Sequence, residues 1–400
     1  MSRSASITRR RRTLVAGMAV LTAAGAGLAL TGLSTVQNST AGDYQETTAP
    51  DEPGYQARVV PTPTMAVLHR GPGGVLAGAW LLSLEPDDDG GSVLLVPTAT
   101  VVAADAEGGD GGETTLDEVY RRDGAAAAAQ AMGQAVTVAV AEHTEVDDAR
   151  WARLVDPVGQ VEVTLDEAVG DWPAGEVALA PDEVGPFLEA RDGGETDLDR
   201  LDRQQLFWNA WLPLVAEAGP DAVPGEVGTG IGRFVLGVAG GGGTAAPLPV
   251  RRDEGAARGP GGRGGVPGDG VVFRPDAALL GEFVARTVPY PTAPAPGARI
   301  RVRLLNGTRE AALTNLVARE LVAGGAEVTI AGNAMSLDEA ETTIAFTGAD
   351  REHLATWLAA RLGGARVEET PGGEDTSVAS DEEIDVTVIL GHDAEDLIGR

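Results

Sequence analysis

The hydrophobic positions of the chain change their spacing several times, and the first change marks a membrane segment. Residues 13–36 are largely apolar and carry no charged side chain. As a helix they would extend about 36 Å, and a bilayer core is about 30 Å thick. Arg3 and residues 9–12, all arginine, precede them. The positive-inside rule therefore predicts a single-pass anchor at the cell membrane, with a cytoplasmic tail (1–12) and everything after residue 36 outside the cell.

A cleaved signal peptide is the alternative interpretation of this segment. Its apolar region is usually about 7–15 residues long, which is shorter than the stretch found here. The arginine cluster also faintly resembles a twin-arginine signal. Both interpretations place the bulk of the protein outside the cytoplasm.

Short apolar runs alternate with helical patterns from residue 63 onward. Residues 37–62 are polar and interrupted by proline, which predicts a linker. The alternation over residues 63–288 predicts a layered α/β domain. Residues 237–270 are glycine-rich and are predicted to be a flexible insertion in it. The expected strands are Ala79–Leu84, Val93–Pro97, Val136–Ala141 and Val161–Leu165, and the expected helices include Ala125–Met132 and Leu198–Leu212, the latter stopped or kinked by Pro213.

A second, smaller unit comes after a proline-rich linker at residues 289–298. In residues 299–394, four or five strands alternate with two helices that end at paired glycines. The fold class is therefore α/β: a layered α/β sandwich and a small C-terminal α/β domain, behind an N-terminal transmembrane helix.

Charge and composition exclude several functions. The chain has 60 acidic against 30 basic residues, a net charge of −30. This charge argues against nucleic acid as a partner, because phosphate binding needs a basic face. Without cysteine, the chain has no disulfide, no thiolate catalysis and no cysteine-ligated zinc. The four histidines lie too far apart in the sequence for a local metal-binding motif: His69, His143, His353 and His392.

Three passages of the C-terminal unit are similar to the LytR C-terminal domain. They are VRLLNGT at Val302–Thr308, AGNA at Ala331–Ala334 and DVTVILG at Asp385–Gly391. Upstream, Asp197–Gln205 (DLDRLDRQQ) resembles the D-x-x-R-x-x-R-Q-Q motif of the LytR-CpsA-Psr family. The resemblance implies an α/β sandwich in a membrane-anchored, extracytoplasmic protein. Active members of that family transfer glycopolymers from a polyprenyl-pyrophosphate carrier to peptidoglycan, using magnesium and an arginine cluster.

The motif supplies candidate binding residues for polyprenyl pyrophosphate or another anion. If Leu198–Leu212 is helical, two arginines and a glutamine share one face at positions i, i+3 and i+4, and Leu201 and Trp208 lie on another. Arginine binds phosphoryl oxygens bidentately. The alternative is an Asp199–Arg203 pair on a solvated surface, worth about 0.3–0.5 kcal/mol. With an upstream arginine and the first aspartate, the candidates are Arg191, Asp197, Arg200, Arg203 and Gln204.

Departures from the family pattern argue against catalysis. The family's Pro-Arg-Asp-Thr passage corresponds to residues 97–100, where Thr98 and Ala99 replace its arginine and aspartate. An upstream aspartate falls on Ala77, and another arginine on Glu189. Magnesium prefers carboxylate ligands, which alanine does not supply. We therefore expect no catalytic residue, no metal site and no cofactor, with Mg²⁺ as the alternative.

The leading hypothesis is a non-catalytic binding or scaffolding protein in cell-wall glycopolymer assembly, in effect a pseudoenzyme. Its expected partners are the membrane, and a polyprenyl-phosphate lipid or a cell-wall glycopolymer. The alternative is an active, magnesium-dependent glycopolymer transferase with a rewired metal site at Asp105 or Asp197. Transcriptional regulation fits poorly, because the acidic bulk would lie across a membrane from the genome.

Overall fold

The computed structural model describes residues 49–85, 90–103, 113–223, 228, 230–253, 271–370 and 384–398. From Pro50 onward they belong to one compact unit. The predicted cytoplasmic tail, the anchor at 13–36 and residues 37–48 of the linker lie outside the described residues. Within the described part of the chain, no helix is long and apolar enough to cross a membrane.

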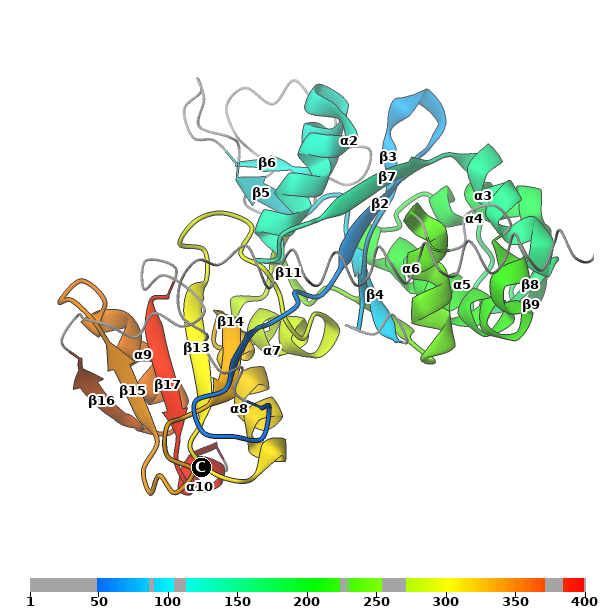
Figure 1. Cartoon of the computed structure of the whole chain (residues 1–400). Helices are drawn as coiled ribbons and strands as arrows, with labels where there is room; N and C mark the ends of the chain where they lie inside the picture. Colours follow the sequence, from blue (N-terminus) through cyan, green and yellow to red (C-terminus); the bar gives the residue numbers. More distant parts are fainter. Residues whose placement is uncertain are drawn as a thin grey trace, which may run out of the picture. The chain divides into compact units, whose positions relative to one another are not determined.

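A five-stranded mixed sheet forms the centre of the first domain (Figure 1). β3 pairs antiparallel with β2 and β4, while β7 and β10 add parallel strands at the two edges. Every residue of β3 is buried, as a strand covered on both faces requires. In sheet order the strands are β10 (Thr244–Pro247), β4 (Gly91–Val96), β3 (Leu76–Leu84), β2 (Thr64–Arg70) and β7 (Glu142–Val146).

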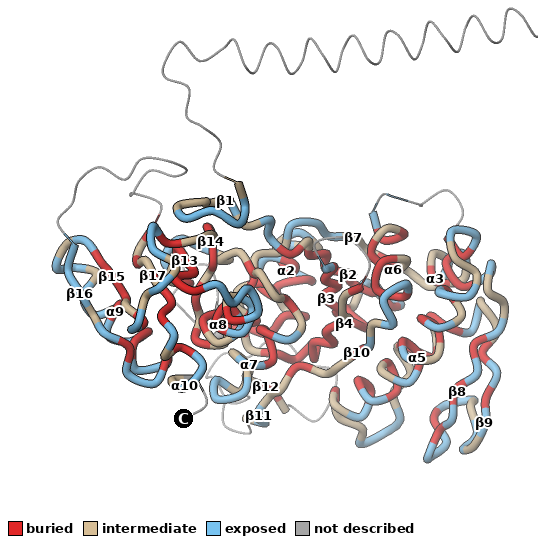
Figure 2. The backbone as a smooth tube through the Cα atoms, turned by 60° about the horizontal axis from the view of Figure 1, so that its bottom comes forward, coloured by how far each residue is buried: buried red, intermediate tan, exposed pale blue. Residues whose placement is uncertain are grey.

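Alternate residues of this sheet enter two separate hydrophobic cores. Val67 and Trp80 point to one core, and their neighbours Ala66 and Leu81 point to the other. The buried positions concentrate along β2, β3 and β4 (Figure 2). The first core contains side chains of α3 (Asp148–Val155), α4 (Val184–Glu189), α5 (Asp197–Ala218) and α6 (Gly230–Gly240), and the second those of α2 (Leu116–Ala135) and α7 (Ala277–Thr287). The predicted layered α/β fold is thereby confirmed.

The buried stripe of α5 differs from the one expected from the sequence. The arginines and Gln204 were predicted on one face and the apolar residues on another, but all are buried along a single stripe. Its C-terminal part packs into a cluster of aromatic rings with Trp80 and Trp151. Its N-terminal part carries the polar residues. The helix also continues through Pro213 to Ala218, beyond the predicted stop.

The segment predicted as a flexible insertion is partly regular. α6 runs to Gly240, β10 pairs with β4, and β11 (Val250–Asp253) pairs with β12 (Val272–Pro275). Residues 254–270 lie outside the described part. The remaining elements of this domain are β5 (Val101–Ala103), β6 (Glu113–Thr115), β8 (Val161–Leu165), β9 (Gly175–Leu179), η1 (Pro72–Gly74), η2 (Asp156–Val158), η3 (Pro181–Glu183) and η4 (Gly219–Ala222).

The C-terminal domain is a six-stranded sheet with its own core. Among the described residues of 300–398 there are five strands and three helices, one helix more than predicted, and the α/β class agrees with the prediction. The sixth strand, β1 (Gln56–Arg58), comes from the predicted linker and pairs antiparallel with β14. The other elements are β13 (Ile300–Asn306), α8 (Ala311–Ala323), β14 (Ala326–Asn333), β15 (Thr343–Phe346), α9 (Glu352–Arg361), β16 (Arg366–Glu369), β17 (Val386–Leu390) and α10 (Ala394–Ile398).

Candidate functional site

Asp197, the first residue of α5, lies at the centre of a buried polar cluster. Its side chain is only 2% exposed. Oδ2 accepts hydrogen bonds from Thr98 Oγ1 at 3.0 Å and from the Ala99 backbone N–H at 2.8 Å. Oδ1 accepts from Nη2 of Arg191 at 2.5 Å and from Nη2 of Arg200. Four donors from three parts of the chain therefore enclose one carboxylate.

The surrounding groups keep Asp197 ionised. Burial raises its pKa, but the Arg200 charge, the Ala99 N–H, the Arg191 charge and the Thr98 hydroxyl together hold that pKa below its usual range. Burial in turn lowers the pKa of Arg200, and the charge of Asp197 offsets part of that effect. The cluster itself contains one carboxylate and two guanidiniums, and the charges of Asp117 and Glu189 also act on Arg200.

Arg200 has hydrogen-bonding capacity that the protein does not use. Its Nη2 also donates to Thr98 Oγ1 at 2.9 Å, but its Nε is buried without a hydrogen-bond partner. A buried donor left without a partner costs about 1–3 kcal/mol, which a water or an anion would recover. The side chain of Arg200 is 9% exposed and that of Arg191 is 24% exposed. An incoming anion would therefore meet Arg191 first.

The remaining two predicted residues do not join this cluster. Arg203 is held by Glu195, with Nη1–Oε1 at 2.5 Å and Nη2–Oε2 at 3.0 Å, and it also donates to the carbonyl of Ala190. Gln204 is fully buried and bonded to core groups on β3 and α4. Three of the five predicted site residues come together, and the other two have structural partners.

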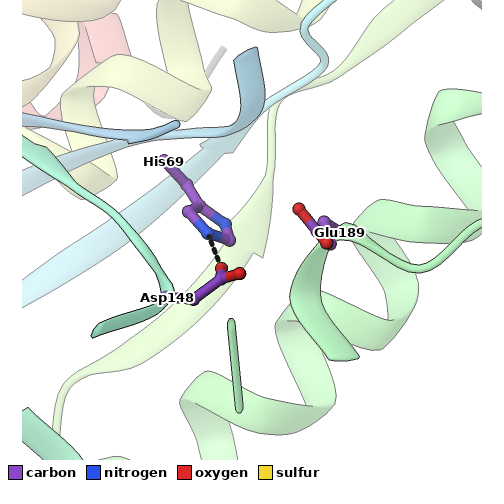
Figure 3. Close-up of side chains that lie close together, drawn as sticks. All are labelled: His69, Asp148 and Glu189. Atoms are coloured by element: carbon purple, nitrogen blue, oxygen red, sulfur yellow. Dashed lines mark hydrogen bonds and ion pairs between the residues drawn. The ribbon is translucent and has the colours of Figure 1, made fainter. Parts of the chain in front are cut away.

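A second cluster, which the sequence did not predict, combines His69, Asp148 and Glu189 (Figure 3). One ligand atom from each lies within 4.8 Å of the others. His69 comes from β2, Asp148 from the first turn of α3 and Glu189 from the end of α4. His69 Nε2 lies 3.0 Å from Asp148 Oδ1, and the imidazole is fully buried against Trp80 and Trp151. Only the fold brings these residues together, because 79 positions separate the first two.

Glu189 has an unusual ionisation within this second cluster. Burial and the charge of Asp148 raise its pKa to about 7, and the charge of Arg200 partly opposes the rise. Its carboxylate makes no hydrogen bond within the described part of the chain. The charge of Arg200 therefore interacts with the carboxylates of both Asp197 and Glu189, and this interaction links the two clusters.

The contacts of Asp197 bear on the magnesium alternative. The positions that resemble the family's carboxylates hold Ala77 and Ala99, and both are buried. Asp197, offered by the alternative hypothesis as a metal ligand, already accepts four hydrogen bonds. Asp105, the other residue offered, lies outside the described residues.

Comparison with known proteins identifies the C-terminal domain. Residues 299–393 match the family model described as LytR cell envelope-related transcriptional attenuator. This match confirms the predicted LytR C-terminal domain. A search of curated proteins finds no match.

Several solved structures resemble the larger part of the chain at low identity. TagV of B. subtilis is 16% identical, with 57% of this chain and 99% of that chain covered and a TM-score of 0.43. The LytR-Csp2A-Psr enzyme from Actinomyces oris is 15% identical, with 52% and 89% covered and a TM-score of 0.38. A structure of TagT bound to LIIa-WTA is 13% identical, with 62% and 93% covered and a TM-score of 0.44. These TM-scores are low, and the functional assignment depends instead on residues 299–393 and on the geometry of the site.

Proposed function

We propose that this protein is a membrane-anchored, extracytoplasmic component of the cell envelope that binds the phosphate groups of a polyprenyl-linked or wall glycopolymer without transferring it. The envelope assignment is supported by the LytR C-terminal domain at residues 299–393. The membrane anchor is proposed from the uncharged segment at residues 13–36 and the arginines before it.

Arg191 and Arg200 are the proposed phosphate-binding residues. The two guanidiniums share the carboxylate of Asp197 in a site with little exposed surface. In such a site an ion pair is stronger than in water. The unpartnered Nε of Arg200 gives a bound phosphoryl oxygen a donor that no protein group uses.

The enclosure of Asp197 carries the proposal that the site is not catalytic. Phosphoryl transfer depends on metal ions and cations that neutralise the charge developing in the transition state. Asp197 is bonded to both of these arginines, and four hydrogen bonds occupy its oxygens. A ligand held here would therefore be bound without a metal-ligating carboxylate at the arginines themselves.

Binding to lipid vesicles tests this proposal. The full chain is mixed with vesicles containing polyprenyl pyrophosphate or, as a control, uncharged polyprenol. We expect binding to the pyrophosphate vesicles only, and we expect Arg200→Gln to weaken it about tenfold or more. Arg153→Gln is the matched control, because Arg153 is an exposed arginine of the same domain. Equal binding by both variants and the unmodified protein would remove the proposed site.

A transfer assay separates the binding protein from the transferase alternative. The full chain is incubated with a polyprenyl-pyrophosphate glycan, peptidoglycan and magnesium. The proposal expects binding without covalent attachment of the glycan to peptidoglycan. Attachment that requires both magnesium and Arg200 would establish the transferase instead.

A further inference from the structure

We propose that His69, Asp148 and Glu189 form a binding site for a divalent transition-metal cation such as Zn²⁺ or Mn²⁺. This departs from the expectation of no metal site, and it stands independently of the proposed function. The first support is geometric. Two ligands about 2.1 Å from one ion are about 3.0 Å apart at a right angle and about 3.4 Å apart at the tetrahedral angle that zinc prefers. His69 Nε2 and Asp148 Oδ1 are separated by 3.0 Å.

Glu189 completes the set after a small movement. Ligands of one tetrahedral ion are separated by about 3.4 Å, and the three ligand atoms here lie within 4.8 Å of one another. The Glu189 carboxylate must therefore move inward by about 1.4 Å or less. Its side chain is half-buried and makes no hydrogen bond to the described residues, so no hydrogen bond has to break for this shift. Figure 3 shows Glu189 on α4, across from the His69–Asp148 pair.

The buried imidazole of His69 offers Nε2 as the ligand atom, 3.0 Å from Asp148 Oδ1. In the tautomer that leaves Nε2 unprotonated, its lone pair faces the carboxylate, and an ion between the two atoms would bind both. Nδ1 keeps its proton in that tautomer and has no hydrogen-bond partner.

The donor set determines which cation is expected. One imidazole nitrogen and two carboxylate oxygens suit zinc and manganese, whereas magnesium prefers oxygen ligands and retains much of its water. Two carboxylates close together also repel each other, and a divalent cation removes that repulsion. The nearest cationic side chain of the neighbouring cluster, Arg200, is committed to Asp197.

Two glycines leave the space in which this cluster forms. A Cβ on Gly185 would lie 2.4 Å from Asp148 Oδ1 and 2.7 Å from the Asp148 Cα. A Cβ on Gly71 would lie 2.7 Å from Glu189 Oε2. Gly71 has an extended backbone, with φ −78°, which alanine adopts without strain. Gly71→Ala would therefore push the Glu189 carboxylate aside without altering any of the three ligands.

Equilibrium dialysis of the full chain against Zn²⁺, Mn²⁺ and Mg²⁺ tests the site. We expect about one Zn²⁺ or Mn²⁺ per chain, with Mg²⁺ bound at least tenfold more weakly. Glu189→Gln and Asp148→Asn should each lower the affinity for Zn²⁺ or Mn²⁺ about tenfold or more, and Gly71→Ala should lower it several-fold. His69 is fully buried, and its replacement threatens folding. The test therefore uses substitutions at the half-buried Asp148 and Glu189.

Glu176→Gln is the matched control, because Glu176 is an exposed glutamate on β9 with the same change of charge. It should bind the cation as the unmodified protein does. No binding by the unmodified protein, or equal affinities in Glu189→Gln and Glu176→Gln, would overturn the proposal, as would a preference for Mg²⁺. These outcomes are independent of the vesicle assay, so failure of the cation site is distinguishable from failure of the proposed function.

Discussion

Trp80 donates its indole N–H to Oε1 of Gln204 over 3.1 Å, inside the first hydrophobic core. The amide of Gln204 in turn donates to the carbonyls of Leu188 at 3.0 Å and Ala77 at 3.3 Å. Gln204 thus joins α5 to β3 and to α4 at a fully buried position. The motif that contains Gln204 also contains the arginines, but the side chain of Gln204 is directed to the core.

Gln204→Ala is therefore expected to affect folding more than ligand binding. The substitution removes three hydrogen bonds, leaves the Trp80 N–H without a partner and opens a cavity. We expect the free energy of unfolding to fall by about 2–4 kcal/mol. Urea denaturation measures this change, with Gln160→Ala as an exposed control expected to change stability by less than about 0.5 kcal/mol. A variant of unchanged stability that no longer binds the pyrophosphate vesicles would contradict this structural role.

Asp197→Asn is expected to destabilise the protein in a pH-dependent way. At neutral pH it removes the charge that both Arg191 and Arg200 face, and we expect a loss of about 3 kcal/mol. The pKa of Asp197 is lowered in the folded state, so its stabilisation is present above the unfolded pKa of about 3.9 and is lost as the pH falls toward the folded pKa.

Urea denaturation of both proteins between pH 7 and pH 3 checks the sign. The difference in unfolding free energy should be largest near pH 7 and should shrink below about pH 4. Asp182→Asn is the control, because Asp182 is exposed on η3. A difference that stays constant over this range would show that ionisation of Asp197 contributes nothing.

The strands buried on both faces could be predicted from the sequence, and an apolar loop could not be distinguished from them. Ala79–Leu84 and Val93–Pro97 overlap β3 and β4, because continuous apolar runs mark covered strands. The run Val136–Ala141 was predicted as a strand but forms a turn and loop, and the strand is the more polar β7. Apolar side chains in a packed loop show the same local pattern as a strand, and only tertiary contacts separate the two.

The candidate site divides in the same way. Spacing alone predicted that Arg200, Arg203 and Gln204 lie on the same side of a helix. It could not predict that Arg203 binds Glu195 and that Gln204 bonds to Trp80. The His69 cluster forms because β2, α3 and α4 lie together in the fold, and the spacing of residues within one element cannot predict this contact. A histidine at the end of an otherwise apolar strand was the one available signal, and by itself it does not identify its partners.

Arg299→Ala is expected to loosen the start of the C-terminal domain. The buried Arg299 donates to the carbonyl and hydroxyl of Thr137 and to the carbonyls of Val322 and Ala326. Thr137 has a φ of 57°, a left-handed conformation that is unfavourable for threonine. Arg299 therefore helps to hold a strained residue, and we expect its removal to lower the unfolding free energy by about 2 kcal/mol.

Amide hydrogen exchange measures this loosening at Ala139, whose N–H donates to the carbonyl of Thr292 in the proline-rich linker at 2.8 Å. Exchange of this amide should be faster in Arg299→Ala than in the unmodified protein. Arg319→Ala removes an exposed arginine from α8 and serves as the control, with an unchanged exchange rate. Equal rates in the two variants would show that the Arg299 contacts do not restrain the linker.

Gly332→Ala tests whether β1 belongs to the C-terminal sheet. Gly332 lies opposite Gln56 in the β1–β14 pair, and a Cβ there would lie 2.0 Å from the backbone oxygen of Tyr55. Because backbone atoms cannot move aside as a side chain does, β1 should leave the sheet, and the free energy of unfolding should fall by about 1–3 kcal/mol.

Amide hydrogen exchange reports the loss of β1 directly, since the Val59 N–H donates to Thr329 and the Asn333 N–H donates to Tyr55. Both amides should lose protection, whereas Gly193→Ala, with no atom within 4 Å of the added Cβ, should leave them protected. Full protection in Gly332→Ala would mean that residues 56–58 are not a strand of this sheet in solution.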